Sequence, residues 1–196
     1  MLKKLYAILS FPFFIPALVT FALSKNKSLI IDDLKQSYAL IGKEYKNHFE
    51  AFMFMMLMYE KSFRNVFYYR IGSIKYLLRI LLWENPTLHI GSQSIGGGLF
   101  VQHGDATYIF AKSIGKNCYI NQCVTIGYTN KTDAPTILDN VSIKAGAKVL
   151  GKITIGNNVI IGANAVVVKD VPDNCTVVGV PAYIIKKEGK RVNIKL

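Results

Sequence analysis

The chain has 196 residues, a formal net charge of +12 at pH 7 and a hydrophobic content of 51%. This length allows one or two domains, and the apolar content excludes an intrinsically disordered chain. The basic residues are scattered, with pairs such as Lys3-Lys4 and Lys186-Lys187 as the longest runs, and no known nucleic-acid-binding motif is present. We therefore expect no nucleic-acid partner, because an anionic membrane surface or a polyanionic small molecule fits dispersed charge at least as well.

Residues 1–27 form a hydrophobic N-terminal segment. Residues 5–23 are almost wholly apolar, and their length approaches the roughly 20 residues that a membrane-spanning helix needs. Pro12 and Pro16 interrupt the run, and no small-residue cleavage site follows it, so we do not expect a signal peptide. A helix that lies in the membrane surface is the favoured interpretation. A helix packed on the rest of the protein and a true span remain alternatives.

Residues 28–86 are predicted to form an α-helical domain. Ile30, Leu34, Tyr38 and Ile41 recur at the spacing of one helix face, with polar residues between them. Similar apolar patterns follow over residues 49–57 and 63–78, and we expect their methionine and aromatic side chains to form a core. The helical pattern ends at Asn85-Pro86, because the residue before a proline disfavours the helical conformation.

Residues 87–185 show a different period, of six residues. The aliphatic positions that keep this period are Ile114, Ile120, Ile126, Ile137, Ile143, Val149, Ile155, Ile161 and Val167. A period of six fits a three-sided column in which three short strands make one coil of 18 residues, and each aliphatic side chain points inward onto its equivalent in the next coil. The step from Ile126 to Ile137 is longer, so we expect a projecting loop over residues 128–135. Residues 186–196 are predicted to be a basic C-terminal tail.

Several short motifs in this region resemble those of a known family. They are Phe100-Val101-Gln102-His103-Gly104, Asn121-Gln122-Cys123-Val124-Thr125-Ile126-Gly127, Ile143-Lys144-Ala145-Gly146-Ala147, Ile161-Gly162-Ala163 and Val178-Gly179-Val180-Pro181-Ala182. The chain resembles the hexapeptide-repeat acetyltransferases, and within them the serine acetyltransferase-like branch. Residues 63–70 look like the helical lead-in of capsule and exopolysaccharide acetyltransferases. The resemblance implies a left-handed parallel β-helix of hexapeptide repeats, preceded by an N-terminal α-helical region.

The resemblance also implies a catalytic base. The histidine that matches His103 is the general base of the family, which removes the proton of an acceptor hydroxyl as it attacks the thioester of acetyl-CoA. Serine acetyltransferases place an aspartate directly before this histidine, where the present chain has Gln102, and a second histidine where it has Ala134. These departures count against serine as the acceptor. Asp105 is the predicted orienting acid, with Glu84 as an alternative and a solvated carboxylate as the plainer interpretation of either.

The same comparison of motifs predicts the cofactor site. Gly127, Ala145 and Ala163 match small residues that pantetheine passes, although corners of the repeat need small residues in any case. The lysines that we expect near the phosphates of CoA are Lys169 and Lys186, together with Lys144 and Lys187, and a solvated basic face explains them as well. Such sites lie between neighbouring columns in the family, which implies a homotrimer.

The predicted function is therefore an acetyl-CoA-dependent O-acetyltransferase that acts by direct transfer on a hydroxyl of a sugar or polysaccharide precursor. The alternative is a serine O-acetyltransferase of cysteine biosynthesis. A metalloenzyme similar to γ-class carbonic anhydrase would need three converging histidines, so we expect no metal, and a non-catalytic scaffold is the remaining alternative. Three cysteines without metal or redox spacing indicate a reducing compartment. We expect the protein in the cytoplasm, with peripheral contact at the inner face of the cell membrane as an option.

Overall fold

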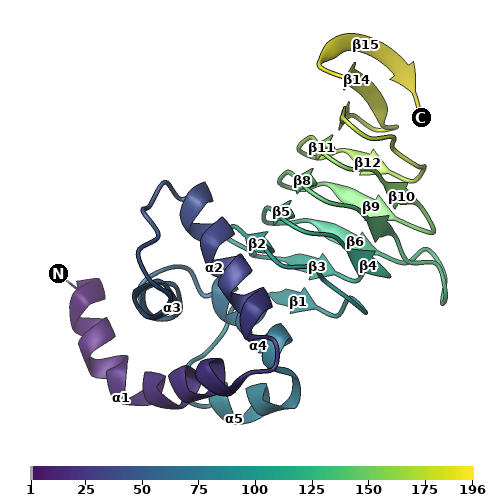
Figure 1. Ribbon diagram of the computed structural model, residues 1–196. Coiled ribbons are helices and arrows are strands. Elements are labelled where there is room, and N and C mark those ends of the chain that lie inside the picture. Colours follow the sequence, from purple (N-terminus) through teal and green to yellow (C-terminus); the bar gives the residue numbers. More distant parts are fainter. Residues whose placement is uncertain (1) are drawn as a thin grey trace.

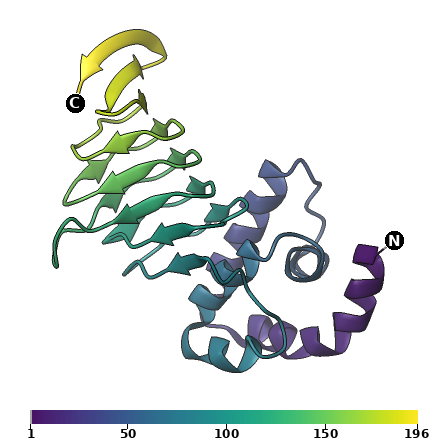
Figure 2. The same cartoon turned by 180° about the vertical axis from the view of Figure 1, so that it is seen from behind.

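The computed structural model describes residues 2–196, with side chains from Phe11 onward. A group of helices occupies the N-terminal end, and a column of short strands rises from it to the C-terminus (Figure 1). Seen from behind, the helices pack only against the first coils, and the C-terminal strands lie at the far end of the column (Figure 2). The expected N-terminal α-helical region followed by a β-helix is confirmed.

The helices follow the periodicities of the sequence. They are α1 (Leu2–Leu23), α2 (Lys27–Leu40), α3 (His48–Leu57), α4 (Ser62–Ile71), the short 3-10 turn η1 (Gly72–Ile74) and α5 (Lys75–Leu78). Helix α3 begins where the side-chain carbonyl of Asn47 accepts a hydrogen bond from the backbone N–H of Glu50, which satisfies one of the free donors of the first turn. The helical core is aromatic, with Phe52 packed against Phe21 and Phe67 at ring-centroid distances of 4.6 and 4.9 Å.

Helix α1 packs on this core through one of its faces. Phe14, Ala17 and Phe21 are buried against α2 and α3, and the helix continues through Pro12 and Pro16. Of the hydrophobic segment predicted over residues 5–23, the side chains of 5–10 lie outside the described residues. Among the described residues, no single helix has the length and apolar character of a membrane span, whereas Phe11–Leu23 and Lys27–Leu40, bent by 116° at their junction, meet both criteria only as a pair.

The column contains three sheets, whose strands are parallel up to β13. Its strands are β1 (Leu88–Ile90), β2 (Phe100–Val101), β3 (Thr107–Ile109), β4 (Ser113–Ile114), β5 (Tyr119–Ile120), β6 (Thr125–Gly127), β7 (Thr136–Ile137), β8 (Ser142–Ile143), β9 (Lys148–Leu150), β10 (Thr154–Ile155), β11 (Ile160–Ile161), β12 (Val166–Val167), β13 (Cys175–Val178), β14 (Tyr183–Lys187) and β15 (Lys190–Lys195). The sheet orders are β1-β3-β6-β9-β12, β10-β7-β4 and β15-β14-β13-β11-β8-β5-β2. Successive strands of the chain alternate among the three sheets, as a left-handed parallel β-helix requires.

The inward ladder explains why the chain adopts this fold. Ile126 lies opposite Val149, and Val149 lies opposite Val167, so equivalent side chains of neighbouring coils are stacked. All nine six-spaced aliphatic residues are at most 3% exposed. Burying one such side chain contributes roughly 1.5–3 kcal/mol, and each stacks on its equivalents in the adjoining coils. The predicted ladder is confirmed, and Val167 belongs to it, while its neighbour Val168 faces the solvent.

Two departures from the period of six change the surface. The residues 128–135 leave the column as a loop, so that Ile120 pairs with Ile143, 23 positions further on instead of the usual 18. The C-terminal residues, predicted to be a tail from residue 186 onward, instead form the antiparallel strands β14 and β15 on β13. These strands cover the last coil, because a solenoid needs a cap where its repeats end.

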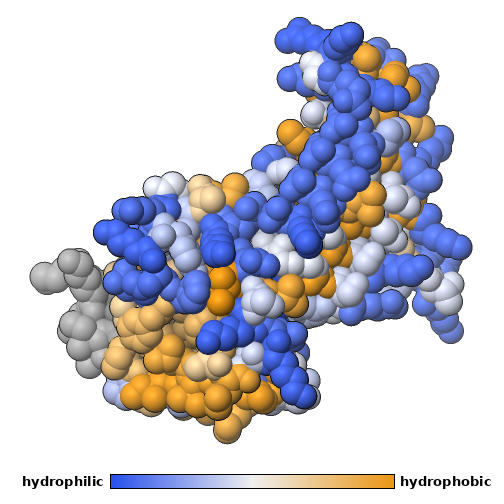
Figure 3. Space-filling model, viewed as in Figure 1, coloured by the Kyte–Doolittle hydropathy of each residue, from blue (hydrophilic) through white to orange (hydrophobic). Residues whose placement is uncertain are grey.

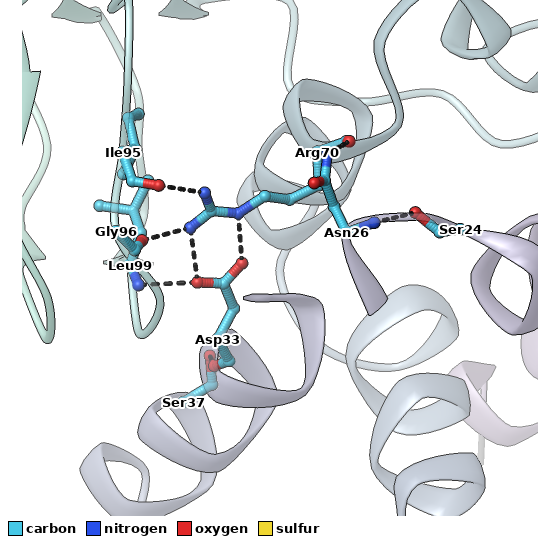
Figure 4. Close-up of polar contacts among 8 residues, drawn as sticks. All are labelled: Ser24, Asn26, Asp33, Ser37, Arg70, Ile95, Gly96 and Leu99. Atoms are coloured by element: carbon cyan, nitrogen blue, oxygen red, sulfur yellow. Dashed lines mark hydrogen bonds and ion pairs between the residues drawn. The ribbon is translucent and has the colours of Figure 1, made fainter. Parts of the chain in front are cut away.

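A buried ion pair joins the helices to the first coil (Figure 4). Two nitrogens of the Arg70 guanidinium donate to the two carboxylate oxygens of Asp33 at 2.8 and 2.9 Å, and both side chains are almost fully buried. Arg70 also donates to the carbonyls of Ile95 and Gly96, while Asp33 accepts from the backbone N–H of Leu99. Burial raises the pKa of Asp33, and the Arg70 guanidinium opposes that rise. Two helices, α2 and α4, are thereby fixed to the β-helix through one network.

Candidate active site

His103 stands at a corner of the column. We use "first corner" for the turns after β2, β5, β8 and β11, which cover residues 102–106, 121–124, 144–147 and 162–165. Each of these turns contains a residue in the left-handed region, such as Cys123, Gly146 and Asn164, and in the first coil His103 has a φ of 64°. Such a φ is uncommon for a residue other than glycine, and asparagine, aspartate and histidine tolerate it best. The corner therefore holds the imidazole at the surface, and half of this side chain is exposed.

Glu60 is the acidic partner of His103. The Nδ1 of His103 lies 2.8 Å from Oε1 of Glu60, and the backbone N–H of His103 donates to Oε2 of the same carboxylate at 2.6 Å. One carboxylate thus holds both the ring and the backbone of the histidine. With Nδ1–H directed at Glu60, the other ring nitrogen, Nε2, is free to accept a proton. Glu60 lies between α3 and α4, so the helical region completes this site.

Asp105, the predicted orienting acid, has a different position. Its Oδ1 accepts from the side-chain amide of Asn85 at 2.8 Å, whereas the imidazole of His103 pairs with Glu60. The same amide donates to the backbone carbonyl of His103 at 3.3 Å, and the backbone N–H of Asn85 donates to the side chain of Asn65 on α4. Asp105 therefore stabilises the turn that carries His103. The alternative, Glu84, lies elsewhere and pairs with Arg79.

Tight packing fixes the turn from below. Gly104 is buried with a φ of 73°, and an added Cβ would lie 3.0 Å from Leu88 and 3.1 Å from Ser62. A side chain at this position would push the turn away from α4.

An open cavity of about 500 Å³ lies in front of the histidine and is lined by Tyr59, Glu60, Lys61, Asn85, Pro86, His103 and Asp105. This cavity is large enough for a small acceptor molecule and the end of a thioester.

The first corner also carries two of the predicted cofactor residues. Ala145 and Ala163 are stacked in successive coils, because the backbone N–H of Asn164 donates to the carbonyl of Ala145. They lie on the same edge of the column as His103, in later coils. Beside this edge, the Lys144 ammonium lies 4.2 Å from the ring centroid of Tyr119, and burial lowers the pKa of this lysine. The hydroxyl of Tyr119 donates to the side chain of Gln102, next to His103.

The other predicted cofactor residues are not at this corner. We use "second corner" for the ends of β3, β6, β9 and β12 and the turns that follow them, and both Gly127, the last residue of β6, and Lys169, after β12, lie there. The Lys169 ammonium donates to the backbone oxygen of Leu196 at 2.8 Å. Lys186 is exposed on β14 and pairs in register with Thr176. Within one chain, then, the structure brings Ala145 and Ala163 together with His103, but it does not bring Gly127, Lys169 or Lys186 to them.

A basic cavity under the loop of residues 128–135 was not foreseen from the sequence. Lys112 and Lys152, at the second corner of two coils, and Lys131, in the loop, line a cavity of about 730 Å³. The loop is held in shape by Asp133, whose carboxylate accepts from the backbone N–H groups of Thr129 and Asn130. The carboxylate also accepts from the Thr129 hydroxyl, and this side-chain hydrogen bond lowers the pKa of Asp133. The three lysines are far apart in sequence, and only the stacking of coils brings them together.

The remaining histidines make contacts of their own, and of the cysteines only Cys123 lies at the first corner, where its backbone N–H donates to the carbonyl of Asp105. His89 stacks on Tyr108 with ring centroids 4.8 Å apart, and Nδ1 of His48 contacts the hydroxyl of Tyr45. The three cysteines are free, with Cys118 and Cys175 buried and Cys123 exposed. Within the part of the chain that the structure describes, no group of three or more histidine, cysteine, aspartate or glutamate side chains could hold a metal ion.

These features define a class of protein: a hexapeptide β-helix with a carboxylate-held histidine at one corner. The family model of the bacterial transferase hexapeptide, with six repeats, matches residues 134–169. A serine acetyltransferase of Staphylococcus xylosus is 50% identical over 109 residues, which cover 54% of this chain and 50% of the relative. A crystal structure of Neisseria gonorrhoeae serine acetyltransferase in complex with serine is 32% identical, with a TM-score of 0.64, and the match covers 80% of this chain and 67% of that one.

A second solved structure has the same fold. Serine acetyltransferase from Brucella abortus strain S19, in complex with coenzyme A, is 28% identical, with a TM-score of 0.68 over 87% of this chain and 72% of that chain. The chain belongs to the hexapeptide-repeat transferase family. It spans about half the length of the first curated relatives that it matches.

The comparisons also correct the sequence-based prediction of function. The predicted sugar or polysaccharide acceptor is wrong, because relatives at 42–50% identity are named serine acetyltransferase. The resemblance of residues 63–70 to capsule and exopolysaccharide acetyltransferases receives no support either. In the structure, this segment has a physical role of its own, since Asn65 bonds to Asn85 beside the histidine and Arg70 joins α4 to the first coil. Residues 63–70 therefore serve to pack the helices onto the column.

Proposed function

We propose that this chain transfers the acetyl group of acetyl-CoA to the hydroxyl of L-serine. The observation that carries the proposal is the pair formed by His103 and Glu60 at the edge of a β-helix similar to that of serine acetyltransferases. The relatives by sequence bear that name, and one of the similar structures contains coenzyme A and another serine. Serine is thus the acceptor that the likeness favours.

The geometry accounts for the proton transfers. Nε2 of His103 accepts the hydroxyl proton while the serine oxygen forms a bond to the thioester carbonyl carbon. The tetrahedral intermediate then breaks its C–S bond, and the CoA sulfur takes the proton back from the imidazolium. The products are O-acetylserine and CoA. No acyl-enzyme is needed, because the acceptor attacks the donor directly.

Glu60 has two effects in this scheme. It fixes the tautomer, so that the basic nitrogen is the one facing the cavity, and it stabilises the positive charge that the ring carries between the two transfers. The aspartate that serine acetyltransferases place before their histidine is Gln102 here. In the proposed mechanism, Glu60 from the helical region has the orienting role that the sequence predicts for Asp105.

The proposed cofactor site uses both corners of the column. Ala145 and Ala163 lie on the first corner, whereas Gly127 and Lys169 lie on the second, so a groove between two copies of the chain would bring the two sets together. This arrangement supports a homotrimer in which each groove is lined by two neighbours. Lys112, Lys131 and Lys152 add positive charge at the second corner, where phosphate groups of CoA would be attracted. The proposed location is the cytoplasm, because the three cysteines form no disulfide and acetyl-CoA is the proposed donor.

The experiment is a measurement of free thiol released from acetyl-CoA by the purified full chain. L-serine, L-threonine, L-homoserine and no acceptor are compared, and the product is identified by mass spectrometry. Release that depends on L-serine, with O-acetylserine as product, is expected. Release that does not depend on L-serine, or none at all from a protein that binds acetyl-CoA, overturns serine as the acceptor.

A further inference from the structure

One side of helix α1 is apolar and uncovered. Phe11, Ile15, Val19 and Leu23 recur every fourth residue, so they form one row along the helix, and each is between 42% and 80% exposed. The opposite side of the same helix, with Phe14, Ala17 and Phe21, already packs on the helical core. The exposed row therefore contributes nothing to the interior of this chain.

A second apolar segment lies beside the end of α1. Ile74, Tyr76, Leu77, Ile80 and Trp83, in and after η1 and α5, are each more than half exposed. Val19 and Leu23 line the same groove as Ile71 and Ile74, which shows that the two segments adjoin. We name the exposed apolar side chains of residues 11–23 and 74–83 the apolar base. In Figure 3 it is the continuous orange area below the column, at the place of α1 and α5 in Figure 1.

The charge around the apolar base is positive. Lys25 and Lys27 follow α1 and are exposed, while Lys75 and Arg79 lie in the second segment. Residues 1–31 contain no acidic residue, and the acidic residue in the segment 72–84 is Glu84, which is ion-paired with Arg79. A large exposed apolar patch with a basic rim is the combination by which proteins bind the surface of anionic membranes.

We infer that the apolar base docks this protein on an anionic lipid surface. A second copy of the chain is the competing occupant, but a symmetric contact would bring the basic rim of one copy onto that of the other, and like charges oppose such a contact. Lipid headgroups with negative charge complement the rim, and the apolar row inserts among the acyl chains. The column extends away from the apolar base, so its C-terminal end points into the solvent (Figure 1). This inference does not depend on the acceptor or on catalysis.

Trp83 is the single tryptophan of the chain and is 70% exposed on the apolar base, which makes it a native reporter. The full chain is mixed with vesicles of phosphatidylcholine alone or of phosphatidylcholine with phosphatidylglycerol. Co-sedimentation and a blue shift of the Trp83 emission are expected with the anionic vesicles, and both should weaken at high salt, because salt screens the attraction. Quenching of Trp83 by brominated acyl chains should accompany the shift.

Matched variants distinguish binding through the apolar base from nonspecific binding by other exposed basic or apolar residues. Lys25→Glu with Lys27→Glu should weaken vesicle binding by more than about tenfold, since each basic residue near an anionic surface strengthens binding roughly fivefold. Lys190→Glu with Lys195→Glu changes the charge equally at the far end of the column and should leave binding close to that of the unchanged chain. Leu77→Ser with Ile80→Ser should remove the fluorescence shift, while Val180→Ser with Ile194→Ser should keep it.

Three results overturn the inference. The first is no binding to anionic vesicles by the folded chain, and the second is equal binding to neutral and anionic vesicles. The third is a shift of Trp83 emission that follows protein concentration without lipid, together with a change in mass by light scattering, which would assign the apolar base to contact between copies. None of these measurements uses acetyl-CoA. Their outcome therefore tests membrane docking independently of the thiol-release assay, which tests serine as the acceptor.

Discussion

At the scale of residues, His103 could be identified from the sequence, whereas its partner Glu60 could not. His103 lies in a motif that the family shares, so the resemblance was enough to single it out. Glu60 lies 43 positions earlier, in a helical region whose pattern reports only burial, and nothing marks this carboxylate among the others. Only folding shows which of the acidic side chains reaches the imidazole.

The role of Glu60 can be tested by Glu60→Gln. The amide keeps the shape but loses the negative charge, so the imidazolium is less stabilised during transfer and we expect kcat to fall by about 10- to 100-fold with a smaller change in KM. His103→Asn should lower kcat by about 10²–10⁴-fold. Steady-state rates of thiol release check both, and Glu44→Gln, an exposed carboxylate away from the site, is the control. Equal rates for Glu60→Gln and the control would remove Glu60 from the mechanism.

The cysteines offer a second test at this scale. Burial raises the pKa of the Cys118 thiol to about 12, so hardly any thiolate exists at pH 8 in the folded chain. Cys123 is exposed at the first corner. Iodoacetamide at pH 8 should therefore modify Cys123 rapidly and Cys118 only after denaturant is added. Peptide mass spectrometry at successive times measures the order, and rapid modification of Cys118 without denaturant would contradict the buried position.

At the scale of elements, the strands of the column were predictable because burial repeats with each coil. Every sixth residue must be apolar where three sides enclose one core, and this requirement appears in the sequence as a period of six. The strands β14 and β15 were missed, since the repeat ends before them and their residues are rich in lysine and mostly exposed. Their structure comes from pairing with β13, which no local pattern announces.

Two neighbouring isoleucines on β11 test the inward ladder. Ile161 is fully buried, whereas Ile160 is 42% exposed on the outer face of the same strand. Ile161→Ala should lower the free energy of unfolding by about 2–5 kcal/mol, because it removes methyl groups and leaves a cavity between two coils. Ile160→Ala should change it by less than about 1 kcal/mol in the isolated chain. Urea unfolding followed by circular dichroism compares them, and equal losses would argue against the ladder.

At the scale of the whole molecule, the arrangement of the two halves was beyond sequence reasoning. The periods of the sequence change near residue 86, and the helices and the column meet through buried polar groups that those periods do not predict. Arg70 and Asp33 are 37 positions apart, and Arg70 also reaches the carbonyls of the first coil. Charged residues in a helix are usually solvated, so neither could be assigned to a buried junction from its place in the pattern.

Breaking the Arg70–Asp33 pair should lower the free energy of unfolding more than breaking a partly exposed ion pair. Arg70→Met leaves the Asp33 carboxylate buried without its partner, and we expect the free energy of unfolding to fall by about 3–5 kcal/mol. Arg79→Met breaks the pair with Glu84, in which the Arg79 side chain is 43% and the Glu84 side chain 14% exposed, and should cost less, about 1–2 kcal/mol. Chemical denaturation of both variants gives the comparison. A loss for Arg70→Met no larger than that for Arg79→Met would mean that the network does not hold the halves together.

The contact between Glu60 and His103 has a consequence for how such a chain can be divided. A piece trimmed to the β-helix would retain its imidazole and its coils but lack the group that aims the ring. The helices therefore do more than cover the first coil, because they supply the carboxylate that holds the proposed base. Exchanging the helices for those of a relative would replace the partner of His103 without changing the column. The basicity of the proposed base could therefore change while the β-helix stays the same.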